Sequence, residues 1–250
     1  MPILNFTGEM PNIVPMADVP FRGVKALLAG MSGTGKTRSV MTCPKPVMYI
    51  TSEDKYSSIL PTEMEGISKV EVRNFQQFIN TIIANCEESH HPGFRFKTIF
   101  IDSLTDLANL RISELRPIYK DSRQAYFQTQ TEMLEIFRVI RNTDANVIGI
   151  CLLDRYTDSE NFTKYGPLFP GKEFQKQVPS QFDEIYIAQS KRNPEGNIEY
   201  YYQTQNDGKY ECKSCSDVLP AFMEPDWTKI INMIESRSQF FDSTANSPSY

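Results

Sequence analysis

The fold is decided by the stretch Gly30-Met31-Ser32-Gly33-Thr34-Gly35-Lys36-Thr37, in which three glycines precede a lysine and a threonine. An apolar run, Val24–Ala29, comes before it and predicts a buried strand. The residues from Lys36 onward predict a short helix that ends at Pro44 and Pro46. A strand, a glycine loop and a helix in this order are typical of a triphosphate site, because glycines let several backbone N–H groups converge on the phosphates. We therefore predict a phosphate-binding loop here.

The side chains of this loop have separate chemical roles. The Lys36 ammonium is expected to reach the β- and γ-phosphate oxygens and to act in catalysis, and the Thr37 hydroxyl is expected to hold Mg²⁺. The start of the following helix presents its positive end to the anion. The predicted cofactors are accordingly ATP and Mg²⁺. The residues predicted to bind the nucleotide are Gly30, Met31, Ser32, Gly33, Thr34, Gly35, Lys36, Thr37 and Arg38.

The composition is that of a globular protein with one sizeable core. The chain has 250 residues, of which 40% are hydrophobic and 23% charged. Its apolar runs are far shorter than the roughly 20 residues that cross a bilayer, and its first twenty residues have no signal-peptide pattern, so we expect a cytoplasmic protein without a membrane partner. Five irregularly spaced cysteines favour reduced thiols. The net charge of −5 confines any contact with nucleic acid to a local patch.

Strand and helix patterns alternate along the chain, which predicts an α/β fold with a mostly parallel sheet covered by helices. The predicted strands are residues 24–29, 47–50, 69–72, 97–102, 146–153, 185–188, 198–204 and 210–213, and the predicted helices are about 74–88, 104–118, 123–141 and 225–234. Asn206-Asp207-Gly208 is a hairpin signal and is expected to join the last two strands. We divide the chain into an extension at 1–22, one domain at 23–236 and a disordered tail at 237–250.

Two acidic residues after apolar strands are candidates for the nucleotide site. Asp102 ends Ile99-Phe100-Ile101-Asp102 and fits an acid that holds Mg²⁺ through water, although Asp102 or Ser103 could instead cap the next helix. Glu53 follows the second strand and fits a catalytic carboxylate that orients or deprotonates the attacking water. The alternative for Glu53 is an ordinary solvated acid in a turn.

The order of these motifs resembles the RecA-type ATPase core: a small-small-Glu turn, Thr51-Ser52-Glu53, lies between the glycine loop and the strand that ends in Asp102-Ser103. Residues 22–235 resemble the compact phage nucleotide-binding proteins of the RecA-like group, some of which anneal single strands. Phe182-Asp183-Glu184 and the hairpin Asp207-Gly208-Lys209-Tyr210 fit their general pattern. The resemblance implies a RecA-like fold with a C-terminal β-hairpin region, in which Lys36 and Thr37 bind phosphate and Mg²⁺, Asp102 supports the metal and Glu53 activates water.

The resemblance also implies two further features, and the sequence departs from both. A polar residue that senses the γ-phosphate maps near Asp154, where an acid suits an anion poorly and Arg155 is the alternative. Such proteins act as oligomers that complete a neighbour's site through a Lys-x-Arg element. Here Lys213 is kept as the trans-acting candidate, but Cys215 stands where arginine is expected, and a solvated strand-end lysine is the alternative. Cys212 and Cys215 could also be read as half of a zinc site, without a good second pair.

The segment 154–182 has no convincing period and is expected to be a long functional loop or a partly ordered insertion. Within it, basic residues alternate with aromatic ones, as in proteins that bind single strands through the backbone and the base faces. The candidate DNA-binding residues are Arg155, Lys164, Lys172 and Lys176, and the interleaved aromatics are Tyr156, Phe162, Tyr165, Phe169 and Phe174. Nearby acids cancel much of the charge, so the aromatics could instead anchor the segment on the core.

Taken together, the sequence predicts a RecA-like ATPase that acts on single-stranded DNA in phage recombination or annealing. The expected partners are single-stranded DNA, further copies of the chain in a homo-oligomer, and a single-strand DNA-binding protein. Two alternatives stay open. One is a small-molecule or nucleotide kinase, for which residues 154–178 offer only Arg155 near the phosphates. The other is a nucleotide-gated binding module with little turnover.

Overall fold

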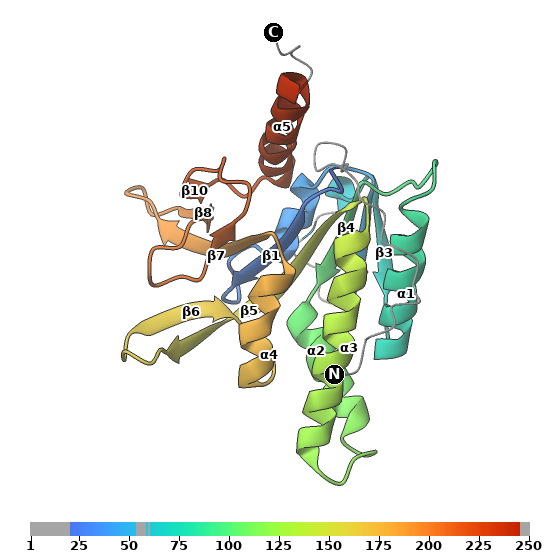
Figure 1. Cartoon of the computed structure of the whole chain (residues 1–250). Helices are drawn as coiled ribbons and strands as arrows, with labels where there is room; N and C mark the ends of the chain where they lie inside the picture. Colours follow the sequence, from blue (N-terminus) through green and yellow to red (C-terminus); the bar gives the residue numbers. More distant parts are fainter. Residues whose placement is uncertain (1–20, 54–58, 60, 246–250) are drawn as a thin grey trace, which may run out of the picture.

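The computed structural model describes residues 21–53, 59 and 61–245. Most of the predicted extension at 1–22 therefore lies outside the described residues. A central sheet runs through the molecule in the strand order β10-β8-β7-β1-β5-β4-β2-β3, with β6 paired to β5 and β9 paired to β7 (Figure 1). The strands are β1 Lys25–Gly30, β2 Val47–Thr51, β3 Ile67–Glu71, β4 Thr98–Asp102, β5 Asn146–Thr157, β6 Thr163–Pro167, β7 Glu184–Arg192, β8 Ile198–Gln203, β9 Lys213–Ser214 and β10 Phe222–Met223.

The middle of the sheet is parallel. β1 pairs in parallel with β5 on one side and with β7 on the other, and β4 continues the parallel pairing from β5 to β2. One strand, β5, therefore separates the strand before the glycine loop from the strand that ends in Asp102. Since the carboxyl ends of parallel strands meet at one edge, the residues that follow β1, β2 and β4 come together there. The predicted α/β class, with a mostly parallel sheet flanked by helices, is confirmed.

Two hydrophobic clusters cover the two faces of the sheet, because alternate residues of each strand point to opposite sides. In β1, Leu27 belongs to the cluster under the helices α1, α2 and α3, whereas Leu28 belongs to the cluster under α5 and the short 3₁₀ helix η2. In β4, Ile99 and Phe100 divide in the same way. The helices are α1 Phe75–Glu88, α2 Leu104–Leu115, α3 Ser122–Asn142, α4 Lys172–Gln177 and α5 Trp227–Ala245, and the 3₁₀ helices are η2 Thr37–Thr42, η3 Pro61–Glu63 and η4 Val178–Gln181.

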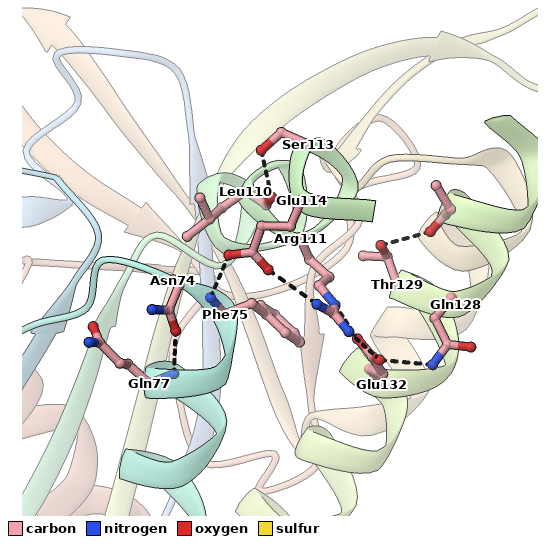
Figure 2. A network of polar contacts seen from close by, with 11 residues as sticks. Asn74, Phe75, Gln77, Leu110, Arg111, Ser113, Glu114, Gln128, Thr129 and Glu132 are labelled. Carbon is pink, nitrogen blue, oxygen red and sulfur yellow. Dashed lines mark hydrogen bonds and ion pairs between the residues drawn. The ribbon is translucent and has the colours of Figure 1, made fainter. Parts of the chain in front are cut away.

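A network of polar contacts joins α1, α2 and α3, the three helices that cover one face of the sheet (Figure 2). The guanidinium of Arg111 on α2 donates to both carboxylate oxygens of Glu132 on α3, at 2.6 and 2.7 Å. It also donates to Glu114, whose other oxygen accepts the backbone N–H of Phe75 at the start of α1 over 2.9 Å. The Asn74 side chain caps the same helix by accepting from Gln77 N–H. One guanidinium thus fixes the mutual position of α1, α2 and α3.

The segment 154–182, predicted to be a long functional loop or a partly ordered insertion, consists mostly of regular secondary structure, so the loop prediction is wrong. β5 continues to Thr157 and turns back as β6, pairing Arg155 with Tyr165, and α4 and η4 fill the rest (Figure 1). The sequence pattern missed the hairpin because β6, Thr163–Pro167, contains a glycine and a proline and has no apolar alternation.

Three smaller differences concern local elements. The phosphate loop is followed by the 3₁₀ helix η2. The turn at 206–208 does not join two paired strands, because β8 pairs with β7 and β10, and β9 pairs with β7. The last helix continues to Ala245, beyond the predicted end at 234 and into the segment predicted as a disordered tail. Within the described part of the chain, no helix is both long and apolar enough to cross a membrane.

Candidate nucleotide site

The glycine loop curls around the side chain of its own lysine. The Lys36 ammonium donates to the carbonyls of Gly30 and Met31 at 2.7 and 2.8 Å, and the side chain is largely buried. Burial lowers the pKa of Lys36, and the neighbouring Cys151, Asp102 and Asp106 oppose that shift. Gly35, directly before the lysine, has a φ of 81°, which favours glycine at this turn. The backbone of the loop therefore surrounds the positively charged ammonium group of Lys36.

Thr37 and Asp102 meet at the edge of the sheet as the sequence predicts. The Thr37 hydroxyl donates to Oδ2 of Asp102 over 2.7 Å, and the hydroxyl of Tyr49 on β2 donates to the same oxygen over 2.8 Å. Burial raises the pKa of Asp102, and the two hydrogen bonds oppose this shift by favouring the carboxylate. Burial and the adjacent Asp102 raise the pKa of Tyr49, so its phenol keeps the proton that it donates.

The helix α2 is capped by Ser103 and not by Asp102. Ser103 is the N-cap of α2, and its side chain accepts the backbone N–H of Asp106 over 3.2 Å. The Ser103 hydroxyl also donates to the Asp106 carboxylate. Asp102 is the last residue of β4 and keeps its carboxylate for Thr37 and Tyr49. Ser103 thus caps the helix, and the Asp102 carboxylate remains at the site where we predict that it supports Mg²⁺.

Glu53 lines the same cleft as Lys36, Thr37 and Asp102. This cleft of about 970 Å³ is lined by loop residues 32–38, by Glu53 and by Asp102. The backbone N–H of Glu53 donates to the Thr51 hydroxyl over 3.0 Å, directly after β2 ends. The segments after β1 and β2 and the last residue of β4 thus contribute a lysine, a glutamate and an aspartate to one cleft.

Comparison with known proteins agrees with this geometry. Residues 22–216 match the AAA domain family. The chain belongs to this family. The match covers the loop, Glu53 and Asp102, and it places the chain among the P-loop ATPases.

A solved structure also resembles this AAA domain in part. It is the crystal structure of the KaiC-like protein PH0186 from the hyperthermophilic archaeon Pyrococcus horikoshii OT3, with 16% sequence identity and a TM-score of 0.43. The similarity covers 72% of this chain and 77% of the archaeal one. None of the curated proteins searched matches the chain.

The residues of the AAA domain fit ATP with Mg²⁺. Mg²⁺ is commonly held by one or two carboxylates together with substrate phosphates and water. A hydroxyl and a carboxylate 2.7 Å apart, Thr37 and Asp102, provide such a pair beside the loop. Lys36 and Arg38 bring positive charge to the phosphate side of the cleft. Among the described residues, no group of three or more His, Cys, Asp or Glu side chains could hold a metal ion by itself, and this weighs against the zinc reading of Cys212 and Cys215.

The two residues considered as sensors of the γ-phosphate do not line the cleft. Asp154 accepts a hydrogen bond from the Gln175 side chain over 3.0 Å, and Arg155 is exposed on the β5–β6 hairpin. Lys213 donates to the backbone carbonyls of Phe182 and Pro179 at 2.6 and 3.3 Å within its own chain. Its role toward a neighbouring copy stays a prediction.

The candidate DNA-binding residues are spread over three elements, β5, β6 and α4, and most of the aromatic residues between them make contacts within the fold. Lys164 contacts Asp158 and the carbonyl of Gly208, whereas Lys172 and Lys176 are exposed on α4. The aromatic residues other than Phe162 are held in the fold: Phe169 and Phe174 are buried against Phe137, Tyr165 stacks on Tyr210, and Tyr156 donates to Glu211. Phe162 alone is strongly exposed, at 61%. The alternative in which the aromatics anchor the segment therefore accounts for four of the five.

Four residues to which the structure gives a place in or beside the cleft were not predicted from the sequence: three of them line it, and the fourth, Tyr49, bonds to Asp102. Asp106 could have been found, because Ser103-Leu104-Thr105-Asp106 is a capping-box pattern directly after the strand acid. Tyr49 lies within the apolar strand 47–50, where no sequence pattern marks its hydroxyl as a partner of Asp102. Tyr200 and Pro225 line the cleft from distant parts of the chain, and no local pattern points to them.

Proposed function

We propose that this AAA domain binds Mg·ATP and hydrolyses it to ADP and phosphate. The observation that carries the proposal is the meeting of Lys36, Thr37 and Asp102 with Glu53 around one cleft, on segments that follow three parallel strands. A loop that only bound nucleotide would need the first three residues. The Glu53 carboxylate in the same cleft supplies the group that hydrolysis additionally requires.

Each side chain has a defined task in this reaction. Lys36 exchanges its two loop carbonyls for phosphate oxygens, and Thr37 and Asp102 hold the cation. Bound Mg²⁺ would supply charge neutralisation at the phosphate oxygens. Glu53 orients the attacking water and accepts its proton as the water oxygen bonds to the γ-phosphorus. The bond from that phosphorus to the bridging oxygen breaks, and ADP leaves with the electron pair.

ATP turnover and ATP binding, measured side by side, test these assignments. Glu53→Gln should keep ATP binding within a few-fold and lower turnover by roughly 100-fold or more, as expected for loss of a general base. Lys36→Ala should lose both binding and turnover. Glu71→Gln is the matched control, because Glu71 ends the neighbouring strand β3 outside the cleft and is paired with Lys69. Normal turnover in Glu53→Gln would remove the assignment, and an inactive wild-type protein that still binds ATP would favour the gated binding module.

Single-stranded DNA as the effector of this ATPase is a separate proposal. It is supported by the exposed Phe162 and Arg155 on a β5–β6 hairpin that extends away from the sheet (Figure 1). Adding single-stranded DNA should raise ATP turnover, and Phe162→Ala with Arg155→Ala should abolish the increase without changing basal turnover. If turnover is the same with and without DNA and no complex forms, the DNA proposal fails. The homo-oligomer, the single-strand DNA-binding protein and the recombination pathway in a phage remain predictions.

The kinase alternative differs in its product. A kinase transfers the γ-phosphate to an acceptor and needs cations around that acceptor. Among the described residues that line the cleft, the cationic side chains are Lys36 and Arg38, both on the loop segment. Incubation with labelled ATP and nucleoside or nucleotide acceptors should give labelled inorganic phosphate. A labelled acceptor would support the kinase instead.

A further inference from the structure

The cleft has a second wall whose chemistry differs from that of the catalytic wall. Glu53, Asp102 and Asp106 form an acidic side, which comes from the ends of β2 and β4 and the start of α2. The other side is formed by Tyr200 of β8 and by Pro225, which follows β10. Tyr200 is the only aromatic residue among the described residues that line the cleft. The two walls therefore suit different parts of a ligand.

The strand order places these walls on opposite sides of the phosphate loop. β8 lies two strands from β1 in one direction, through β7, and β4 lies two strands from β1 in the other, through β5. The cation and the γ-phosphate belong on the β4 side, beside Thr37 and Asp102. The remainder of a bound nucleotide then extends over the loop toward β7 and β8.

Tyr200 is positioned to receive a flat ring at that end. Its ring lies beside Gly35, where the nearest ring carbon is 3.5 Å from the place that a Cβ would occupy. The side chain remains 43% exposed, although it lies next to the phosphate loop. An exposed tyrosine face beside a phosphate site offers the apolar surface on which a nucleobase stacks.

Pro225 is held beside this surface by the start of the last helix. The backbone N–H of Trp227 donates to the Thr42 hydroxyl over 3.0 Å, and its indole N–H donates to the Ser39 hydroxyl over 3.1 Å. Both acceptors belong to η2, the element directly after the loop. These two hydrogen bonds thus fix the segment that contains Pro225 to the element that follows the phosphate loop.

We infer that Tyr200 and Pro225 form the nucleobase-binding wall of this site, with the Tyr200 ring stacked on the base. The inference rests on the proposed ATP binding. It assigns recognition of the base to stacking, which every nucleobase permits, so Tyr200 should contribute to affinity for ATP and GTP alike.

Comparison of ATP with inorganic tripolyphosphate tests the inference, because the two ligands share the phosphates and differ in the nucleoside. Tyr200→Ala should weaken binding of ATP and GTP about tenfold and change binding of Mg·tripolyphosphate less than twofold, whereas Tyr200→Phe should bind all three as the wild type does. Ile198→Ala is the control, since Ile198 is exposed at the start of the same strand and does not line the cleft.

Two results would overturn the inference. One is ATP binding that is unchanged in Tyr200→Ala. The other is an equal loss for ATP and tripolyphosphate, which would mean that the residue supports only the loop. A wild-type protein that binds neither ligand would instead contradict the proposed function, so the two failures are distinguishable.

Discussion

The hydroxyl of Tyr49 donates a hydrogen bond to Oδ2 of Asp102 over 2.8 Å, the same oxygen that accepts from Thr37. Tyr49 and Phe100 face each other in register across β2 and β4, with ring centroids 6.0 Å apart. The phenol is thus positioned by packing, and it orients the carboxylate at the edge of the sheet. Tyr49 is a positioning residue for the metal side of the cleft.

Tyr49→Phe should keep the ring contact and remove this donor. We expect about tenfold lower ATP turnover at limiting Mg²⁺, because the carboxylate loses one of the two bonds that orient it, and recovery toward the wild-type rate at high Mg²⁺. Tyr201→Phe is the control, since its hydroxyl bonds to Gln189 outside the cleft. An identical dependence on Mg²⁺ in Tyr49→Phe and the wild type would contradict the positioning role.

Arg111→Met tests the network that joins three helices. The substitution leaves Glu132 and Glu114, both mostly buried, without their cation, so we expect the free energy of unfolding to fall by about 1–3 kcal/mol in denaturant titrations. Arg123→Met breaks a pair whose arginine is 90% exposed, and it should leave the unfolding midpoint unchanged. Equal effects of the two substitutions would show that the network of Figure 2 adds nothing specific.

Gly23→Ala should destabilise the protein much more than Gly196→Ala. Both glycines have positive φ, of 73° and 87°, so each substitution adds backbone strain of about 1–2 kcal/mol. A Cβ at Gly23 would also lie 2.9 Å from backbone atoms of Ala145, whereas a Cβ at Gly196 would meet nothing within 4 Å. The difference between the unfolding free energies of the two variants therefore measures the cost of the steric clash at Gly23. A difference near zero would mean that the backbone shifts at little cost in free energy to accommodate the methyl group.

Lys25→Met tests a buried lysine outside the nucleotide site. Burial lowers the pKa of Lys25 to about 8, from 10.5, while nearby Asp183 is the main opposing charge. Between these values the unfolded chain holds a proton that the folded chain has released, so this residue makes the unfolding free energy rise with pH, by up to about 1.4 kcal/mol per unit. Between pH 8 and 10 we expect the unfolding free energy of the wild type to rise relative to that of Lys25→Met. Parallel curves of unfolding free energy against pH for the two proteins would contradict this.

The local part of the site could be predicted from the sequence, because each of its motifs is short and continuous. Lys36 and Thr37 follow the apolar run 24–29 through the glycine loop, Glu53 comes two residues after β2, and Asp102 ends β4. The parallel order of these strands brings the four residues to one edge. The side chains that complete the cleft depend on pairing between distant segments. Tyr200 reaches the loop only because β8 returns beside β7, and the sequence pattern does not encode that pairing locally.

The limits of prediction have the same origin. Phe169 and Phe174 lie among charged residues in the sequence, so either stacking on bases or packing on the core was compatible with the pattern, and in the structure both pack against Phe137 in the core. The hairpin signal at 206–208 is a genuine turn, with Asn206 accepting the N–H of Gly208, but its flanking strands pair with other partners. Turn chemistry is local, whereas the choice of a strand's partner is settled by the whole sheet.

The contact between Trp227 and Ser39 joins residues 188 positions apart. During synthesis on a ribosome the phosphate loop emerges long before the indole that supports η2 and the proline beside it. A nascent or truncated chain that stops before Glu224 carries every residue of the glycine motif without a finished nucleotide site. Competence to bind ATP should therefore depend on synthesis of the segment that contains Pro225 and Trp227, and a chain without α5 should bind ATP weakly although its glycine loop is intact.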